Sequence, residues 1–592
     1  MRKTWILFAL SLCLSSCLKP FEDTSFIPEA AVMSWSAESR SVSKDATSFE
    51  LTLYSNLPWM IRPSVTWISV TPDRGTGDAV LTVKVAKNRT VEDRSGYLRA
   101  IVTADQYSDF HITQGKNDSS GESISYYVKT DGDPQASGLS WTNATSLKNA
   151  FELAGDGDVI LVAAGTYTPQ AFLEGADESD PSDKTFQIHS NFTLQGGFPA
   201  NADDATFDQV ADYDPSVNKT TLSGTLDGGK NAYHVVSVSA VKMEGKKALL
   251  KGFTITGGST SDEKEYFITS GGSTFYRGYG AGINVGASAI DIEDCIITGN
   301  VANLNAAGAY FYVHSEVSMT DCRVISNETR GNAGGVWNCG GTLYMNRCSI
   351  SDNIADGQCA GFYSINSEGA PSVSRIYNCT ISGNDNTMTA GRSGGGAYIR
   401  EWSDAVFVNC TFYGNKSGNG GAIQGYGANG KTSTLTMINC TITGNSATVM
   451  GGGVSLWNNY NTTNIYNCII SGNQSPAGAD IGYGSNIGTN TPNLFYYTTI
   501  LDKSLYASTG VATSGWNFDV ATMLSAFGTW GGKTMTCPLV EGETNPACSQ
   551  GMTREDLVAT GAALNPAVEA SVFDTDQRGV AREKNTIGST TL

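Results

Sequence analysis

One short phrase returns seven times in this 592-residue chain: Cys, any residue, Ile or a similar residue, two small residues and Asn. Its cysteines stand 26 to 31 residues apart, at Cys295, Cys322, Cys348, Cys379, Cys410, Cys440 and Cys468. A repeat of this length is too short to bury its own apolar face and must stack on its neighbours. The chain is therefore predicted to form a solenoid.

The residues of each repeat indicate strands. Segments 409–415 and 439–445 alternate small or apolar with polar residues and stop at Gly-Asn, which is typical of a strand followed by a turn. A Gly-rich phrase follows each Asn, and an apolar residue stands three places before each cysteine. Three strands and three turns per coil predict a right-handed parallel β-helix. The 67 glycines fit this fold, because tight turns need positive φ.

The cysteines of the repeat could have one of three roles: they could form disulfides, bind a metal or pack as free thiols. Equivalent side chains on successive coils point the same way, seven is an odd number, and no pair has the Cys-x-x-Cys spacing of a zinc site. We therefore expect buried free thiols that act as small apolar core residues. Outside the repeat, Cys537 and Cys548 are the pair expected to form a disulfide in an exported protein.

The N-terminus predicts export, because a basic start precedes an apolar stretch at 5–12 that is too short to span a bilayer as a mature helix. Residues 14–17, Leu-Ser-Ser-Cys, resemble the lipobox of bacterial lipoproteins. This resemblance implies a signal peptide at 1–16, a lipid on Cys17, a tether over 17–30 and, with Leu18 after the cysteine, the outer membrane. An ordinary secretory signal with an incidental cysteine is the alternative.

Residues 31–116 predict a separate all-β domain, because short alternating runs are separated by Pro and Gly turns, as in an immunoglobulin-like sandwich. Five segments resemble, in order, the signature of the BACON domain of Bacteroidetes surface proteins: 55–59, 67–77, 87–90, 94–96 and 112–115. The resemblance implies carbohydrate or mucin binding, although Trp59 and Trp67 are expected in the core more than on a ligand platform. Residues 117–124 read as a linker.

The β-helix is expected over 125–502. Residues 146–154 predict a helix with Ser146 as N-cap, lying across the first coil to shield its open edge. The segments 412–415 and 420–423 reproduce the paired motifs of chlamydial polymorphic outer membrane proteins, which the solenoid resembles. Residues 574–579 resemble the closing segment of exported β-helices. We expect them to cap the last coil, within C-terminal coils and a cap at 503–592.

Strand alternation predicts a column of outward-facing aromatic rings on successive coils. Its members are Tyr310, Trp337, Tyr363 and Tyr398, and further exposed candidates are Trp402, Trp457 and Tyr460. Because aromatic faces suit the apolar faces of sugar rings, these residues are candidates for carbohydrate binding. The alternative is that the stacked rings only stabilise adjacent coils.

No catalytic motif stands out. The four histidines lie far apart in sequence, at His111, His189, His234 and His314. Acidic groups at 291–294 and charged groups at 400–404 match no lyase or glycosidase motif and are read as solvated coil edges. A ladder of amides is expected from Asn378, Asn409, Asn439 and Asn467. No catalytic residue, metal site or cofactor is assigned, and there is no motif for calcium.

The net charge of −19 argues against nucleic acid and anionic membrane surfaces as partners, and disfavours sulfated or uronate-rich polymers unless calcium bridges them. We expect a monomeric, lipid-anchored protein of the outer membrane, facing the cell surface, that binds an extracellular or host glycan or acts in adhesion without catalysis. The alternatives are a polysaccharide lyase or glycosidase, and a structural spacer.

Overall fold

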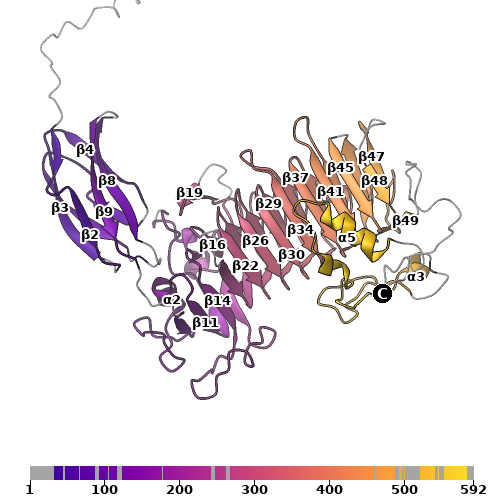
Figure 1. Ribbon diagram of the computed structural model, residues 1–592, viewed down its shortest axis with the longest axis horizontal. Helices are drawn as coiled ribbons and strands as arrows, with labels where there is room; N and C mark the ends of the chain where they lie inside the picture. The colour runs from indigo at the N-terminus through magenta and orange to yellow at the C-terminus, as the bar shows by residue number, and fades with distance from the viewer. Residues whose placement is uncertain are drawn as a thin grey trace, which may run out of the picture. The chain divides into compact units, whose positions relative to one another are not determined.

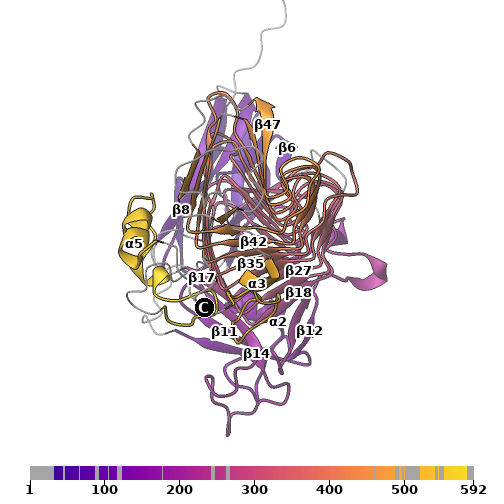
Figure 2. The same ribbon diagram turned by 90° about the vertical axis from the view of Figure 1, so that its right-hand side faces the viewer.

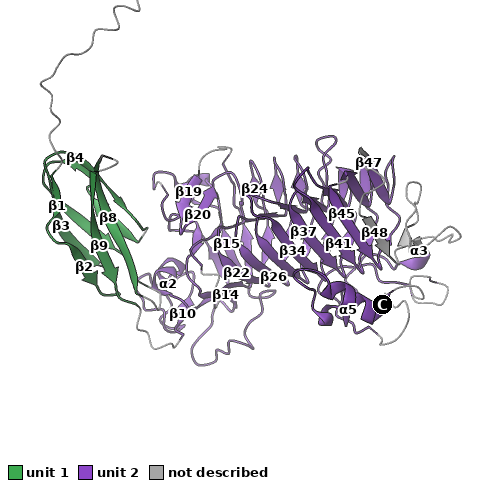
Figure 3. Cartoon of the chain, turned by 45° about the horizontal axis from the view of Figure 1, so that its top comes forward, with its two compact units in different colours: residues 1–88, 92–117 green, residues 89–91, 118–592 purple. Residues whose placement is uncertain are grey.

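The computed structural model divides the chain into two compact units (Figure 3). Unit 1 comprises residues 1–88 and 92–117, and unit 2 comprises 89–91 and 118–592. The structure describes residues 32–44, 47–65, 67–86, 88, 93–103, 106–116, 123–176, 178–241, 247–261, 267–458, 460–486, 493–496, 499–500, 520–540, 545 and 552–582. The predicted lipidation site, Cys17, and the predicted disulfide partner Cys548 lie outside these residues.

Unit 1 is a sandwich of two sheets, with strand orders β1-β3-β7-β5 and β2-β9-β8-β4-β6. In β3, Phe49, Leu51 and Leu53 alternate with more exposed residues and point into the core between the sheets. The predicted all-β domain is thus confirmed. The strands are β1 (Met33–Trp35), β2 (Ser39–Val42), β3 (Thr47–Ser55), β4 (Pro58–Pro63), β5 (Ile68–Thr71), β6 (Arg74–Thr76), β7 (Ala79–Val85), β8 (Arg94–Thr103) and β9 (Gln106–Gln114).

Unit 2 is a right-handed parallel β-helix, as predicted. Successive coils add strands side by side to three long sheets, which run along the solenoid in Figure 1 and superimpose in the end-on view of Figure 2. Sheet 1 contains β10 (Ser125–Val128), β11 (Val159–Ala163), β14 (Thr193–Phe198), β17 (Ala248–Lys251), β22 (Ala289–Glu293), β26 (Glu316–Thr320), β30 (Thr342–Asn346), β34 (Ser372–Tyr377), β37 (Ser403–Val408), β41 (Ser433–Ile438), β45 (Asn461–Tyr466) and β48 (Asn493–Tyr496).

Sheets 2 and 3 complete each coil. Sheet 2 contains β12 (Gly165–Tyr167), β15 (Thr220–Ser223), β18 (Phe253–Thr256), β23 (Ile296–Thr298), β27 (Arg323–Ile325), β31 (Ser349–Ser351), β35 (Thr380–Ser382), β38 (Thr411–Tyr413), β42 (Thr441–Thr443), β46 (Ile469–Ile470) and β49 (Thr499–Ile500). Sheet 3 contains β13 (Phe186–Ile188), β16 (Val236–Val238), β21 (Ile283–Val285), β25 (Ala309–Phe311), β29 (Val336–Cys339), β33 (Phe362–Ile365), β36 (Ala397–Arg400), β40 (Ile423–Tyr426), β44 (Val454–Asn458) and β47 (Ile481–Asn486).

Further short strands and helices lie outside the three long sheets. Between sheets 2 and 3 lie β24 (Val301–Ala302), β28 (Glu328–Thr329), β32 (Ile354–Ala355), β39 (Lys416–Asn419) and β43 (Ser446–Met450), while β19 (Phe267–Ser270) and β20 (Ser273–Tyr276) form a hairpin. The remaining elements are α2 (Leu147–Leu153), η1 (Pro181–Asp183), η2 (Asp227–Gly229), α3 (Val520–Met523), α5 (Arg554–Ala562) and η3 (Ala570–Phe573). Among the described residues, no helix has the length and apolar character needed to cross a membrane.

The predicted capping helix is confirmed as α2. The Ser146 side chain accepts a hydrogen bond from the backbone N–H of Asn149, which satisfies a free donor at the start of the helix. Leu147 and Ala150 are buried against the first coils. The helix therefore joins the solenoid core at its N-terminal end.

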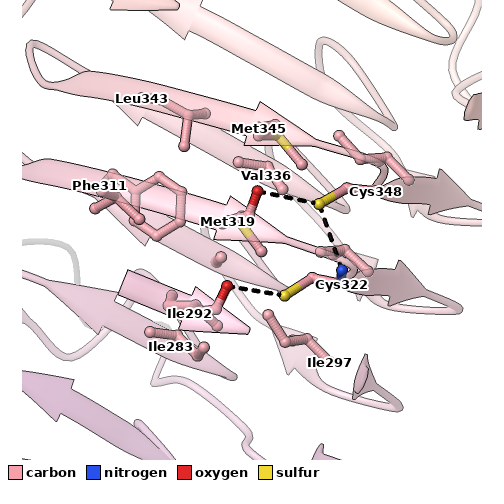
Figure 4. Close-up of a cluster of buried hydrophobic side chains, with 14 of the residues drawn as sticks. Ile283, Ile292, Ile297, Phe311, Met319, Cys322, Val336, Leu343, Met345 and Cys348 are labelled. Atoms are coloured by element: carbon pink, nitrogen blue, oxygen red, sulfur yellow. Dashed lines mark hydrogen bonds between the residues drawn. The ribbon is translucent and has the colours of Figure 1, made fainter. Parts of the chain in front are cut away.

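The seven repeat cysteines are free and buried, as predicted. Figure 4 shows Cys322 and Cys348 stacked beside Met319 and Met345, where the backbone N–H of Cys322 donates to the Cys348 sulfur at 3.4 Å. The Cys322 thiol itself donates to the carbonyl of Ile292. Cys537 is also a free, buried thiol.

Two asparagine ladders run along the solenoid. The predicted one is present at the turn from sheet 1 to sheet 2, where the side chains of Asn378, Asn409, Asn439 and Asn467 each donate to the asparagine of the preceding coil. A second ladder of buried asparagines follows sheet 2, and each of its amides donates to the next until Asp480 accepts from the last. Its members are Asn300, Asn327, Asn353, Asn384, Asn415, Asn445 and Asn473.

The C-terminal segment lies along the side of the solenoid. Helix α5 and η3 pack their apolar residues on Val406, Val408 and Ile438 of sheet 1 (Figure 1). Gln577 donates to the backbone carbonyl of Cys379, and Arg582 donates to the Asn409 side chain. The expectation that residues 574–579 cap the last coil is wrong, because Gln577 bonds to Cys379 and Thr411, which lie on coils before those of β41, β45 and β48.

Candidate functional site

The predicted aromatic column on sheet 3 is a second core. Tyr310, Trp337, Tyr363 and Tyr398 pair in register on successive strands, so the predicted alignment is confirmed. Their exposed fractions are only 2%, 9%, 2% and 6%, so the predicted exposure is wrong. The ring centroids of Tyr363 and Tyr398 lie 5.4 Å apart with planes at 19°, a stacked pair within the buried cluster.

The turns that precede each strand of sheet 3 explain this burial. Ala306, Ala333 and Cys359 adopt positive φ there and belong to the same buried cluster as the column. At Gly394, an added Cβ would stand 2.7 Å from the Cβ of Tyr398, which shows how closely the turn lies against the ring column. Burial raises the pKa of Tyr363 to about 12. These rings therefore offer no open face to a ligand.

A second aromatic group lies at the turns from sheet 3 to sheet 1, and we call it the turn row: Trp402, Tyr426, Trp457 and Tyr460. Trp402, Trp457 and Tyr460 are 36%, 40% and 37% exposed, and Tyr426 is half-buried. Gly425 pairs with Leu456, so Tyr426 and Trp457 hold equivalent positions on neighbouring coils, roughly 4.8 Å apart along the stack. The predicted exposure of Trp402 and Trp457 is thus confirmed.

Backbone geometry fixes the orientation of Trp402. The residue adopts a positive φ of 49°, and its indole N–H donates to the carbonyl of Gly430 at 2.9 Å. The Nζ of Lys431 lies 5.5 Å from the centroid of its ring. The guanidinium of Arg400, on the same coil as Trp402, lies 5.4 Å from the ring of Tyr426 on the next coil. The turn row therefore combines preoriented rings with adjacent hydrogen-bond donors.

Charges beside the turn row are balanced. Arg400 and Lys431 both face Glu401, with nitrogen–oxygen distances of 3.1 and 3.9 Å. Arg400 also donates to the hydroxyl of the buried Tyr363 at 3.2 Å. One carboxylate thus serves two cations, and Arg400 connects the buried column to the turn row.

An open groove of about 740 Å³ occupies the same turn on three preceding coils. Residues 314–316 line it from the turn between β25 and β26, residues 340–342 from the next turn, and residues 368–371 from the one after. Tyr344 and Val373 of sheet 1 complete the lining. Glu316 is paired with Lys247, and Glu368 accepts a hydrogen bond from the Tyr312 hydroxyl.

The other charged groups singled out in the sequence have structural partners. Glu293 pairs with Lys251 at 3.0 Å, and Asp294 accepts from the Tyr213 hydroxyl at 2.9 Å. Asp404 pairs with the fully buried Arg375. Among the residues that the structure describes, no three His, Cys, Asp or Glu side chains group closely enough to hold a metal ion.

The histidines and the sandwich tryptophans are not members of the turn row. His234 is buried, and burial lowers its pKa to about 4, while its Nδ1 lies 2.9 Å from the carbonyl oxygen of Gly280. His314 is exposed in the groove. Trp59 is a core residue of unit 1, and Trp67 packs partly buried against that core beneath the guanidinium of Arg94. Neither tryptophan forms an open platform.

Sequence reasoning missed three features of unit 2. Tyr426 and Lys431 were not singled out, although the Gly-Tyr-Gly sequence at 425–427 marks a turn with a ring at its centre. The groove had no signal, because its small residues resemble those of every other turn. The buried asparagine ladder did have a signal in the sequence, because an Asn ends each repeat phrase.

One part of the chain matches a known protein family. The BACON family model, described as a putative binding domain, N-terminal, matches residues 57–115 within unit 1. No curated protein matches.

Among solved structures, pectate lyase Pel9A is 13% identical with a TM-score of 0.41, covering 72% of this chain and 92% of its own. A rhamnogalacturonan lyase is 12% identical with a TM-score of 0.28, covering 71% and 96%. A Bacteroides ovatus GH5 xyloglucanase, in complex with a XXXG heptasaccharide, is 12% identical with a TM-score of 0.14, covering 30% and 38%. The similarity to the BACON family model concerns residues 57–115 alone.

Proposed function

We propose that this protein is a lipid-anchored surface protein of the outer membrane that binds an extracellular glycan through the turn row, without catalysis. The observation that carries the proposal is the set of exposed aromatic residues at the turns from sheet 3 to sheet 1: Trp402 after β36, and Trp457 and Tyr460 two coils further on, with Arg400, Glu401 and Lys431 beside them. Stacked rings with adjacent polar groups are the usual chemistry of sugar recognition. The BACON match, to a putative binding domain, supports a binding role.

A glycan array of plant and host polysaccharides, probed with the purified full-length protein, tests the proposal. A ligand should appear, and a Trp402→Ala, Trp457→Ala double variant should lose at least about tenfold in affinity, since each stacking contact contributes roughly 1 kcal/mol. Trp530→Ala is the matched control, because Trp530 is 49% exposed but belongs to the C-terminal segment. Unchanged binding by a folded double variant would eliminate the turn row.

Two further outcomes decide the rest of the proposal. Release of unsaturated or reducing sugars by the wild-type protein would replace binding with lyase or glycosidase activity. A Cys17→Ser variant should lose lipid labelling and leave the membrane fraction. If this variant still fractionates with the outer membrane, the anchoring proposal is wrong.

A further inference from the structure

We propose that the groove and the turn row form one continuous track for an extended, neutral oligosaccharide that lies parallel to the solenoid axis. This inference rests on the proposed glycan binding and specifies its ligand. The groove supplies three coils of the track, and the turn row supplies the next three. Neither the family match nor the solved structures assign a site to this edge.

Backbone hydrogen bonds make the edge continuous. The N–H of His314 donates to the carbonyl of Gly340, and the N–H of Gly340 donates to that of Ile365, both at 3.0 Å. Further along, Asn366 donates to Glu401 at 3.1 Å, Trp402 to Thr432 at 3.0 Å and Ser433 to Tyr460 at 3.1 Å. Each turn is therefore held in register with the next.

The groove has the size of a sugar site. Its volume of about 740 Å³ falls within the usual range for small-molecule sites. An added Cβ on Gly369 would meet nothing within 4 Å, so the groove is open at this turn. Tyr344, His314 and Glu368 provide a ring and polar groups around it.

The length of the track sets the size of the ligand. Six coils at about 4.8 Å per rung span roughly 24 Å, on the order of five sugar rings in an extended chain. A disaccharide would fill either the groove or part of the turn row, but not both. Affinity should therefore grow with chain length until the track is filled.

The charges along the track favour a neutral ligand. Arg400 and Lys431 are both occupied by Glu401, so neither is a free partner for a uronate carboxylate. Glu368 is exposed in the groove and, among the described residues, has no cation beside it. Together with the net charge of −19, this arrangement would repel an anionic polymer.

Calorimetry with oligosaccharides of two to eight residues, prepared from cellulose, xylan and mannan, tests the inference, with oligogalacturonates as the anionic series. For at least one neutral series, affinity should rise about tenfold or more between two and five residues and then level off. Tyr344→Ala should abolish this gain for long oligomers and leave the binding of short ones at the turn row unchanged. Tyr413→Ala, an exposed tyrosine on sheet 2, should change neither.

The outcomes separate this inference from the proposed function. Binding that is lost in the Trp402→Ala, Trp457→Ala variant but is independent of oligomer length, or is unchanged in Tyr344→Ala, would remove the groove and keep the turn row. Stronger binding of oligogalacturonates would overturn the neutral assignment. If a ligand found on the array binds the Trp402→Ala, Trp457→Ala variant and Tyr344→Ala with the affinity of wild type, both the track and the turn row are wrong.

Discussion

The buried column lies on the strands of sheet 3 and the turn row at the ends of those strands and the turns after them; both are built from Tyr and Trp, yet they differ in solvent exposure. Tyr363 is 2% exposed, while Trp457 is 40% exposed. Both follow strand alternation outward from the solenoid interior. The difference arises at the turns: chain with positive φ lies against the column, whereas the turn row stands where sheet 3 bends into sheet 1.

This contrast separates two roles for aromatic stacks on a solenoid. In the column, the packed rings form a second hydrophobic core and contribute to stability. In the turn row, Trp402, Trp457 and Tyr460 are partly exposed and have polar neighbours, which a ligand needs. Strand alternation predicts the face on which a side chain lies, but it does not predict what covers that face.

The largest expected difference between the two groups is in stability. Tyr363→Ala should lower the free energy of unfolding by about 3 to 5 kcal/mol, the usual cost of truncating a large buried aromatic. Trp402→Ala should cost about 1 kcal/mol, because the residue is 36% exposed and loses one hydrogen bond, to the Gly430 carbonyl. Urea denaturation of both variants measures the difference. Equal shifts in the unfolding midpoint would break the distinction between column and turn row.

The two asparagine ladders allow the same comparison, of the stability lost at a buried and at a more exposed position, with polar side chains. Asn384→Ala removes bonds to the Ile350 carbonyl and to Asn415, both at 2.9 Å, and removes one of the two acceptors of the buried Asn353 amide, which keeps its bond to the Val324 carbonyl. Each unsatisfied group costs about 1 to 3 kcal/mol. Asn439→Ala, at a half-buried position of the other ladder, should cost about 1 kcal/mol. A reversed order in thermal unfolding would contradict our account of the ladders.

A smaller effect should appear at alkaline pH. Burial raises the pKa of Tyr363 from 10.0 to about 12, so the folded state keeps this phenol protonated where the unfolded chain loses its proton. Its contribution is complete below pH 10 and is lost as pH rises toward 12, by up to about 3 kcal/mol. Melting temperature measured from pH 8 to 11 should fall less steeply in Tyr363→Phe than in wild type. Parallel curves would show that the column is solvated.

The repeat fold was predictable because each coil repeats its own signals. The spaced cysteines, the Gly-Asn turns and the Ser146 cap agree with one another, so the solenoid, its thiol core and its capping helix followed from the sequence. The sandwich followed from alternation in segments such as 49–53. These features depend on neighbours that are close in sequence or one repeat away.

The cover of the column and the docking of the C-terminal segment depend on more distant contacts. Ala333 and Cys359 adopt positive φ although neither is a glycine, the residue from which a positive φ is usually predicted. The uninterrupted apolar run at 405–408 was a usable signal, because Val406 and Val408 point away from the core and therefore need a cover, which α5 supplies. The groove between coils had no comparable signal.

Hydroxyl-radical footprinting of the full-length protein, read by mass spectrometry, tests the central contrast most directly. Trp402 and Trp457 should be oxidised rapidly and Trp337 and Tyr363 slowly. Addition of a glycan identified on the array should protect Trp402 and Trp457 and leave Trp337 unchanged. Oxidation of Trp337 at the rate of Trp402, or protection of Trp337 by the glycan, would contradict the account and return the ligand site to the column.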